Sequence, residues 1–329
     1  MLSKKIGIDI GTSTVLVYVK GEGIVVNEPS LAAVNGDGDG TRILAVGHQA
    51  EEMAGHTSNG VHVVRPMQPT EGALHHLIGK VHGRQRLFKP EIMISVPSGV
   101  TSIERRALTE AAISAGARQA WLIDEPLAAA IGAGLPINEP RASAICDIGG
   151  GTTEIAVISL SGMVVALSIR VGGNRIDDAI AAHLERKHNL LVDGRTAEEI
   201  KISAGAAVTM KEPLVGQVRG RDLLSGLPRS LEVSSNEMVE AIQEPLRLIV
   251  VAIRQVLDET PPELAADIFD RGIVLSGGGA QLRGLDRYVA IQTGIPTVVT
   301  DSPQTSVVRG TGLALENFEV LKRNQAYLR

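Results

Sequence analysis

Two short segments of the sequence place an aspartate, glycine and hydroxyl side chains in the same order. Residues 6–12 read IGIDIGT and residues 144–152 read AICDIGGGT, and a second apolar run follows each of them. Glycines let successive backbone N–H groups approach a phosphate because no side chain blocks them. Carboxylates are among the ligands that Mg²⁺ prefers in proteins. The repeated pattern therefore predicts a clamp that holds a magnesium-bound polyphosphate from both sides.

Each repeat supplies one half of this predicted clamp. The first half consists of a metal ligand followed by four phosphate-binding residues, namely Asp9, Gly11, Thr12, Ser13 and Thr14. The second half again has one metal ligand followed by four phosphate-binding residues, and these are Asp147, Gly149, Gly150, Gly151 and Thr152. Either segment alone would be interpreted as a tight β-turn whose aspartate caps a neighbouring amide. It is their recurrence that favours the clamp.

A third glycine-rich segment follows a short apolar run at residues 273–275. It consists of Gly277, Gly278, Gly279 and Ala280. A loop without side chains suits the face of an adenine or the α-phosphate of a nucleotide, although glycine-rich turns between a strand and a helix are common. Main-chain contacts of this kind would serve ATP and GTP alike. The sequence contains neither G-x-x-x-x-G-K-[ST] nor G-x-G-x-x-G, so the two common phosphate-binding motifs are excluded.

Hydrolysis of a nucleotide requires a group that orients the attacking water. The acidic pair Asp124 and Glu125 stands where an apolar run of strand type gives way to a helical pattern. Glu125 is the preferred catalytic candidate because Pro126 sets the start of the helix directly after it. Thr152 is the second residue that we predict to be catalytic. The alternative is that both acids only favour the positive end of a helix.

The elements that would position these residues alternate between strand and helix patterns, which predicts an α/β fold. Runs rich in β-branched residues predict strands at 5–10, 14–19, 142–148, 154–159 and 164–171. The last two are expected to be joined by a turn at Ser161-Gly162. Gly11 breaks the first pair of strands, which predicts a hairpin.

Helix signals occupy the stretches between these strands. Thr101 with Glu104 and Ser234 with Glu237 each match the capping-box pattern at the start of a helix. The first of these helices is expected to run through residue 115. Pro245 must break or restart the second helix. Further helices are predicted at residues 127–133, 174–188 and 311–323, and the last is expected to fold back on the first domain.

Composition limits the class of protein. A chain of 329 residues favours two domains. Apolar residues make up 44% and aromatic residues only 2%, which predicts a core of Ala, Val, Ile and Leu. A net charge of -5 argues against a nucleic-acid partner. Cys146 is the only cysteine, so disulfide frameworks and multi-cysteine zinc sites are excluded. Without a signal-peptide pattern or a membrane-spanning apolar run, the chain is expected to be soluble and cytoplasmic.

Several stretches, in this order, resemble the MreB family of the actin-like ATPase superfamily, which also includes sugar kinases and the large heat-shock chaperones. Besides the first clamp segment they are residues 23–30 (GIVVNEPS), 125–132 (EPLAAAIG), 147–154 (DIGGGTTE), 195–198 (RTAE), 226–229 (GLPR) and 260–264 (TPPEL). The resemblance covers nearly the whole chain. The GLPR and TPPEL stretches serve no evident phosphate chemistry, so they distinguish this family from its superfamily relatives.

The resemblance implies an α/β fold of the actin-like ATPase type. In it, two similar domains, each with a mixed sheet flanked by helices, form four subdomains around a nucleotide cleft. Domain I would comprise residues 1–140 with 311–329, and domain II residues 141–310. Their small subdomains would be inserted at about 31–65 and about 175–245. By position, Glu198 and Lys201 would hold the ribose and base, although a surface ion pair is the alternative for two residues on one helix face.

The resemblance also implies a function. ATP and Mg²⁺ would be the cofactors, and slow hydrolysis would accompany polymerisation into paired filaments. These filaments would lie at the inner face of the cytoplasmic membrane and organise cell-wall synthesis and rod shape. The implied partners are further copies of the chain, the membrane surface and the wall-synthesis machinery.

Two segments depart from the usual family pattern. Residues 11–15 read GTSTV where members usually read GTANT, so a contact from the asparagine would be lost. Residues 68–74 (QPTEGAL) replace the usual DGVIADY, which affects an expected filament contact. A third segment bears on membrane attachment. Leu87 and Phe88 lie among basic residues and are predicted to insert into the membrane, with packing on their own domain as the alternative.

Two other functions are compatible with the superfamily. A small-molecule kinase would need an acceptor pocket with a base near the γ-phosphate, and the sequence shows no second acidic motif for it. A chaperone-like ATPase would need a substrate-binding domain, for which the chain has no further segment. A filament-forming ATPase is therefore the preferred interpretation.

Overall fold

A computed structural model describes residues 3–36, 42–53, 61–64, 71–82 and 89–318. The chain divides into two compact units. Unit 1 comprises residues 1–139, 158–163 and 304–329, and unit 2 comprises residues 140–157 and 164–303. The domain bounds predicted from the sequence stay a prediction. The predicted boundary at residue 311 falls inside a helix that begins at Ser306.

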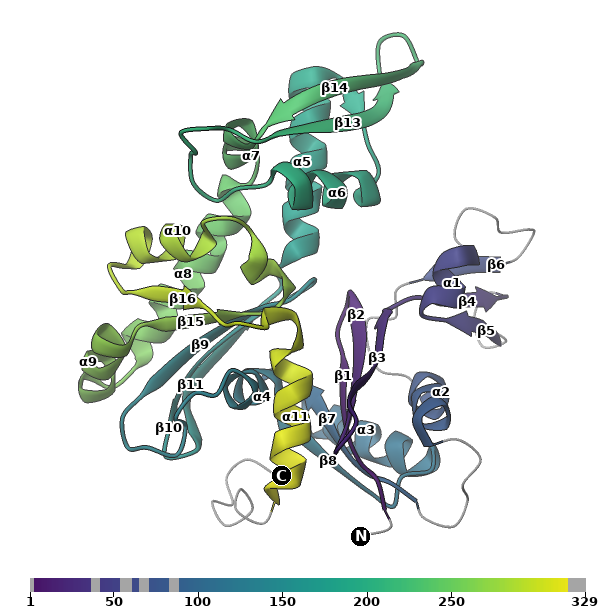
Figure 1. Ribbon diagram of the computed structural model, residues 1–329, viewed down its shortest axis with the longest axis vertical. Helices are drawn as coiled ribbons and strands as arrows, with labels where there is room; N and C mark the ends of the chain where they lie inside the picture. The colour runs from purple at the N-terminus through teal and green to yellow at the C-terminus, as the bar shows by residue number, and fades with distance from the viewer. Residues whose placement is uncertain (1–2, 37–41, 54–60, 65–70, 83–88, 319–329) are drawn as a thin grey trace. The chain divides into compact units, whose positions relative to one another are not determined.

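Unit 1 is built on a five-stranded mixed sheet in the order β3-β2-β1-β7-β8 (Figure 1). Its strands are β1 Lys5–Ile10, β2 Thr14–Val19, β3 Gly23–Pro29, β7 Glu91–Val96 and β8 Gln119–Asp124. The first three pair antiparallel, whereas β1, β7 and β8 run parallel. The predicted hairpin of β1 and β2 is confirmed in both strands.

Four helices accompany this sheet, and they are α2 Glu71–His82, α3 Ser102–Ser114, α4 Glu125–Gly132 and α11 Ser306–Glu316. The capping box that opens α3 is confirmed, because Thr101 accepts from the Glu104 N–H while the Glu104 side chain accepts from the Thr101 N–H. Pro126 lies in the first turn of α4, as predicted. A second, three-stranded sheet in the order β5-β4-β6 carries the short helix α1 His48–Met53, and its strands are β4 Ala32–Asn35, β5 Arg42–Val46 and β6 Val61–Val64.

Helices α4 and α11 approach each other more closely than side chains would permit. A Cβ atom placed on Gly132 would lie 1.8 Å from the Ser306 carbonyl oxygen, and one on Gly310 would lie 1.7 Å from the Ala128 carbonyl oxygen. Both helices therefore meet backbone to backbone, and only glycine fits at these two positions. The close contact holds α11 against the rest of unit 1, which confirms that this helix folds back on the first part of the chain.

Unit 2 repeats the large sheet of unit 1. Its order is β11-β10-β9-β15-β16, and the strands are β9 Ser143–Ile148, β10 Thr153–Ser159, β11 Gly162–Ile169, β15 Ile273–Ser276 and β16 Thr297–Val299. The central strand again has a hairpin partner on one side and parallel strands on the other. The internal repeat seen in the sequence is thus a repeat of topology.

The turn between β10 and β11 differs from the prediction by one residue. The two positive φ angles fall on Leu160 (50°) and Ser161 (62°), and Gly162 already begins β11. A two-residue hairpin turn matches the twist of its strands when both central residues have positive φ. The strands therefore impose a positive φ on Leu160, a residue type that rarely adopts it.

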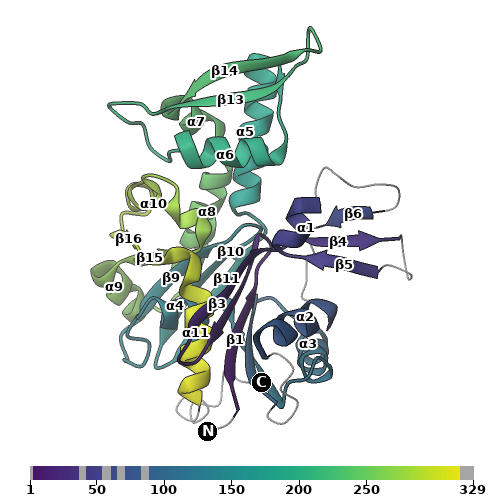
Figure 2. The same cartoon turned by 45° about the vertical axis from the view of Figure 1, so that its right-hand side comes forward.

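The helices of unit 2 are α5 Gly173–His188, α6 Gly194–Ala204, α7 Ser235–Ala241, α8 Gln243–Glu259, α9 Pro262–Arg271 and α10 Leu285–Thr293. Two short 3₁₀ helices are also described. One is η2 Gly278–Gln281, which follows β15, and the other is η3 Pro303–Thr305, which precedes α11. The helix that opens at Ser235 ends at Ala241, and a second helix, α8, begins at Gln243 with Pro245 in its first turn. The predicted restart of the helix near Pro245 is therefore confirmed. A three-stranded sheet in the order β12-β13-β14 lies beside α5, α6 and α7 (Figure 2), with strands β12 Leu190–Leu191, β13 Val215–Asp222 and β14 Pro228–Ser234.

The cores of both units consist of aliphatic side chains, as the composition predicted. The largest fully buried side chains are isoleucines and leucines together with Met93. In the part of the chain that the structure describes, no helix is both long and apolar enough to cross a bilayer.

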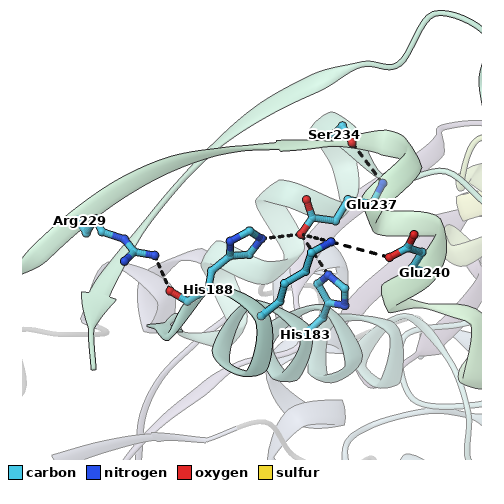
Figure 3. Close-up of polar contacts among 7 residues, drawn as sticks. His183, His188, Arg229, Ser234, Glu237 and Glu240 are labelled. Atoms are coloured by element: carbon cyan, nitrogen blue, oxygen red, sulfur yellow. Dashed lines mark hydrogen bonds and ion pairs between the residues drawn. The ribbon is translucent and has the colours of Figure 1, made fainter. Parts of the chain in front are cut away.

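Glu237 joins α5, α7 and the small sheet of unit 2 through a cluster of basic groups (Figure 3). The predicted capping box is half formed. Ser234 accepts from the Glu237 N–H at 3.2 Å, but the Glu237 carboxylate pairs with His188 at 2.6 Å, His183 at 3.1 Å and Lys187 at 3.5 Å. Burial alone would raise the pKa of Glu237, but the hydrogen bonds from both histidines and the charge of Lys187 hold it below its usual range. The carboxylate therefore serves tertiary packing, and the second half of the local cap is not made.

We predict opposite effects for the same substitution at two glycines of unit 1. Gly310→Ala would force the Cβ against the Ala128 carbonyl and lower the free energy of unfolding by about 1–3 kcal/mol or more. Gly79→Ala in α2, where a Cβ meets nothing within 4 Å, would raise it by about 0.5–1 kcal/mol. Urea unfolding of both variants measures the difference. Equal effects would show that the α4–α11 contact is not close-packed.

We further predict that Glu237→Gln lowers the free energy of unfolding by about 1–3 kcal/mol at neutral pH, because a charged acceptor is lost. A folded-state pKa below the usual value gives stability that is present above pH 4.5 and lost as the pH falls through the folded-state value. The gap between variant and wild type should therefore shrink in acid. Unfolding curves at pH 7 and below pH 4.5 test this, and a gap that stays constant would contradict it.

Candidate functional site

Asp9 lies at the carboxyl end of the central strand of unit 1. Strands β1, β7 and β8 run parallel, so their carboxyl ends meet at one edge of the sheet, where α/β proteins commonly bind ligands. The hydroxyl of Ser95, on β7, donates to the Asp9 Oδ1 at 2.8 Å. Burial raises the pKa of Asp9 to about 6, and the hydrogen bond from Ser95 offsets part of this effect. Among the residues that the structure describes, no cation forms a salt bridge with Asp9, so a bound cation would relieve its buried charge.

The turn after Asp9 is closed by one backbone hydrogen bond, from the Gly11 N–H to the Thr14 carbonyl at 3.0 Å. A Cβ on Gly11 would lie 3.2 Å from that same oxygen, which is tight for any other residue. Thr12 and Ser13 form the tip between the two strands. The predicted residues of this half-site are therefore consecutive residues of one tight turn.

Unit 2 contains the same arrangement around Asp147. Ser276 lies in register with Asp147 on the neighbouring parallel strand, and its hydroxyl donates to the Asp147 Oδ1. The Gly149 N–H bonds the Thr152 carbonyl at 2.9 Å, and a Cβ on Gly149 would again lie 3.2 Å from that oxygen. Aspartate, serine and glycine turn thus recur as a set. Two structurally equivalent half-sites exist, one in each unit.

The first turn of α5 supports the glycine turn of unit 2. The Gly173 N–H donates to the Gly149 carbonyl at 2.9 Å, and the Asn174 N–H donates to the Gly150 carbonyl at 2.8 Å. A Cβ on Gly172 would lie 2.6 Å from the Gly149 oxygen, so this close approach requires glycine. The helix end thus satisfies the Gly149 and Gly150 carbonyls, and the Gly149 N–H closes the turn, so binding of an anion by this turn would fall to the amide groups of residues 150–152. The positive end of the helix dipole would also favour an anion there.

Lys201 on α6 reaches toward the same turn. Its Nζ lies 2.9 Å from the Asp177 carboxylate on α5 and 3.4 Å from the Gly173 carbonyl. Both side chains of the pair are largely buried. Burial raises the pKa of Asp177 to about 6, although Lys201 acts to lower it. The alternative of an ion pair between Lys201 and Glu198 is wrong, because Lys201 pairs with Asp177; Glu198 is partly exposed on the same helix.

The third glycine segment packs against the end of β9. A Cβ on Gly277 would lie 2.3 Å from the Ile148 carbonyl oxygen, and one on Gly279 would lie 2.5 Å from the Ile148 side chain. The segment forms η2, which begins at Gly278 and includes the buried Ala280. These glycines therefore bring the loop beside Asp147 and the turn that follows it. Contact with a nucleotide base stays a prediction.

The acidic pair at the end of β8 is divided between two roles. The Asp124 carboxylate accepts from the Arg105 guanidinium of α3, and burial raises the pKa of Asp124 despite that contact. Asp124 thus ties α3 to the sheet. Glu125 begins α4 at the carboxyl edge of the parallel strands, in the same unit as Asp9.

Sequence reasoning missed three residues of these half-sites. Ser95 and Ser276 each end a short apolar run, and this shared pattern could have revealed them as a second repeat. Asp177 was missed because the pairing of α5 with α6 has no local signal. The predicted membrane residues Leu87 and Phe88 lie outside the described residues, so their insertion stays a prediction.

Comparison with known proteins identifies the family. A family model described as MreB/Mbl protein matches residues 3–323. The cell shape-determining protein MreB of Escherichia coli strain K12 is 48% identical over an alignment of 331 positions, gaps included, that covers 97% of this chain and 95% of that protein. The cell shape-determining protein Mbl of Bacillus subtilis strain 168 is 42% identical over an alignment of 333 positions that covers 99% of both chains.

The fold agrees with this assignment. The crystal structure of MreB5 of Spiroplasma citri bound to ADP superimposes with a TM-score of 0.89 at 34% identity, covering 99% of both chains. A structure of the same protein bound to AMPPNP gives the same values. The fold is actin-like, as the resemblance implied. With a family model that matches nearly every residue and relatives that are similar over their full length, the chain belongs to the MreB/Mbl family.

Proposed function

We propose that this protein binds and hydrolyses Mg-ATP and assembles into filaments that determine cell shape. The duplicated half-site carries the proposal. In each unit the next-to-last residue of the central strand is an aspartate that accepts a hydrogen bond from a serine, and a glycine turn follows the strand. The binding of a polyphosphate with a metal ion explains such a duplicated set better than two unrelated turns do. The relatives whose structures contain ADP and AMPPNP support the choice of nucleotide.

The residues fit a magnesium nucleotide. Asp9 and Asp147 are carboxylates in partly or fully buried positions, which suits a hard cation that prefers oxygen ligands. Bound Mg²⁺ would neutralise the charge of the phosphates. In the turns 11–14 and 149–152, the amide groups of Gly11 and Gly149 close the turns, and the remaining amide groups would donate to phosphate oxygens. Lys201 and Glu198 would bind the ribose and base, and the segment 277–280 would lie against the base or the α-phosphate.

For hydrolysis, we propose that Glu125 orients the attacking water and that Thr152 assists it. Arg105 binds the Asp124 carboxylate and gives that acid a structural role, and Glu125 follows it at the start of α4, at the carboxyl edge of the parallel strands. General-base or water-positioning groups of this kind contribute about 10²–10⁴-fold to a rate. Slow hydrolysis would be coupled to assembly.

The proposals for assembly, membrane attachment and wall synthesis rest on the resemblance to the family. The names of the relatives describe cell-shape determination. We propose that the protein polymerises into paired protofilaments at the inner face of the cytoplasmic membrane and organises the wall-synthesis machinery. The kinase alternative is not supported by the relatives.

We expect light scattering to rise on addition of Mg-ATP, with filaments visible by electron microscopy. Asp147→Asn should lower the affinity for Mg-ATP by about 10–100-fold, because a charged ligand contributes about 1.5–3 kcal/mol. The control is Glu91→Gln, which removes an acid from the amino end of β7 in unit 1, at the other end of that strand from Ser95. Transfer of phosphate to a metabolite without assembly would favour the kinase. Unchanged binding in Asp147→Asn would contradict the half-site.

Membrane attachment makes a separate prediction. Insertion of Leu87 and Phe88 would contribute about 3–6 kcal/mol per subunit, and a filament multiplies this contact. Leu87→Ser with Phe88→Ser should therefore abolish co-sedimentation of filaments with anionic liposomes while assembly in solution persists. Co-sedimentation that the double substitution leaves unchanged would rule out insertion at this loop.

A further inference from the structure

Asp177 on α5 is a buried acid that the proposed function does not use directly. It is 7% exposed, and the Lys201 Nζ on α6 lies 2.9 Å from each of its two carboxylate oxygens. Only Oδ2 accepts a hydrogen bond from Lys201, and no donor in the described part of the chain bonds to the buried Oδ1. A buried carboxylate is costly when its hydrogen bonds are incomplete. Packing alone therefore does not account for an acid at this position.

The ion pair of Asp177 with Lys201 lies beside the glycine turn of unit 2. Gly173 and Asp177 are four residues apart on α5 and share one face of the helix. The Lys201 Nζ contacts both, since it also lies 3.4 Å from the Gly173 carbonyl. A Cβ on Gly173 would lie 3.3 Å from that Nζ and 3.7 Å from the Gly149 carbonyl oxygen. The missing side chain of Gly173 thus leaves room for the ammonium next to the turn 149–152.

Asp177 keeps the ammonium in this place. The Lys201 side chain is only 16% exposed, and a buried ammonium without a counter-charge is strongly unfavourable. The Gly173 carbonyl, at 3.4 Å, is a weak acceptor for it. The stem of a lysine is flexible enough to turn the ammonium out to solvent. Loss of the negative charge of Asp177 would therefore remove Lys201 from the turn.

The other charged groups near Asp177 do not replace Lys201 as its partner. Asp178 on α5 and Glu198 on α6 are acids, and both repel the Asp177 carboxylate. Among the residues that the structure describes, no other cation forms a salt bridge with Asp177.

Helix α5 also packs against α7, α8 and β12. On α8, Glu244 lies 3.7 Å from Arg175, and both side chains are about half exposed. On α7, Glu237 binds two histidines toward the far end of α5. The strand β12 consists of two leucines. The buried charge at this point of α5 therefore depends on the pair of Asp177 with Lys201.

Protonation of Asp177 would break this pair. Burial is the largest effect and raises the pKa of Asp177 to about 6, although Lys201 acts to lower it. The carboxylate is ionised above this pH and becomes neutral as the pH falls through it. The attraction that holds Lys201 beside the turn is therefore present at neutral pH and above, and it is lost in mild acid.

We propose that Asp177 is a positioning residue for the bound nucleotide, which holds the Lys201 ammonium beside the turn 149–152 and must be ionised to do so. This role rests on the proposed function, in which Lys201 binds the nucleotide. Asp177 acts on the affinity without touching the ligand. The alternative, in which the pair only ties α5 to α6, is an outcome that the tests separate.

The first experiment measures the binding of Mg-ADP to the full chain by calorimetry at pH 8, at a protein concentration that gives no light scattering. Lys201→Met and Asp177→Asn should each raise the Kd at least about tenfold, the loss expected for one hydrogen bond from a charged group. Because Asp177 acts through Lys201, the double variant should bind no more weakly than Lys201→Met alone. The control is Asp178→Asn, which removes the same charge from the neighbouring exposed position and should bind like wild type.

The second experiment follows the same binding from pH 8 to pH 5. The Kd of Lys201→Met divided by that of the wild type should be at least about tenfold at pH 8 and should approach one below the pKa of Asp177. Titration of the nucleotide itself cancels in this ratio. The comparison needs only the wild type and Lys201→Met, so it holds even if Asp177→Asn does not fold.

The outcomes separate this role from the proposed function. Asp177→Asn that binds like wild type, or more tightly, would overturn the positioning role and leave the proposed function standing. A double variant whose loss is the product of the two single losses, or a ratio that stays constant with pH, would do the same in favour of a structural ion pair. Lys201→Met that binds like wild type while Asp147→Asn does not would overturn this role and keep the half-sites. Wild-type protein that does not bind Mg-ADP would overturn both.

Discussion

In each unit, the structure depends on a carboxylate near the carboxyl end of the central strand that accepts a hydrogen bond from a serine on the neighbouring parallel strand. Ser95 holds Asp9 in unit 1, and Ser276 holds Asp147 in unit 2. A buried carboxylate is costly unless it is hydrogen-bonded or paired. The parallel pairing of two strands supplies that bond at a fixed register, so the sheet must form before the half-site exists. The glycine turn, the first turn of α5 and the 277–280 segment are then arranged around a point that the sheet has set.

Glycine serves two different purposes around this point. At Gly11 and Gly149 it allows a tight turn, and at Gly172 and Gly277 it allows one piece of backbone to lie against another. The second purpose explains why the half-site of unit 2 draws on three separate segments of the chain. Backbone contacts of this kind vary little with side-chain motion, which suits a site whose ligand is recognised mainly by amide groups.

Local patterns in the sequence predicted what local interactions determine. The hairpin of β1 and β2, the cap of α3 and the two aspartates each follow from residues within one turn or one strand. The sequence did not reveal Ser95, Ser276 or Asp177, because each acts across elements that are far apart along the chain. At Glu237 a local pattern predicted a contact that is not made, because its carboxylate pairs with two histidines of α5 instead of closing the capping box. The one-residue error at Leu160 arose because a hairpin's twist can impose positive φ on a residue that rarely adopts it.

The close contact of α4 with α11 has a consequence for the order in which the chain can fold. Unit 1 contains both β1 and α11, the first and last elements of the described residues, whereas unit 2 is formed from residues that lie between them. During synthesis, all of unit 2 leaves the ribosome before α11 does. The backbone contact at Gly132 and Gly310 can therefore close only after all of unit 2 has been synthesised. Unit 2, with its half-site, can therefore be complete in the growing chain before unit 1 is.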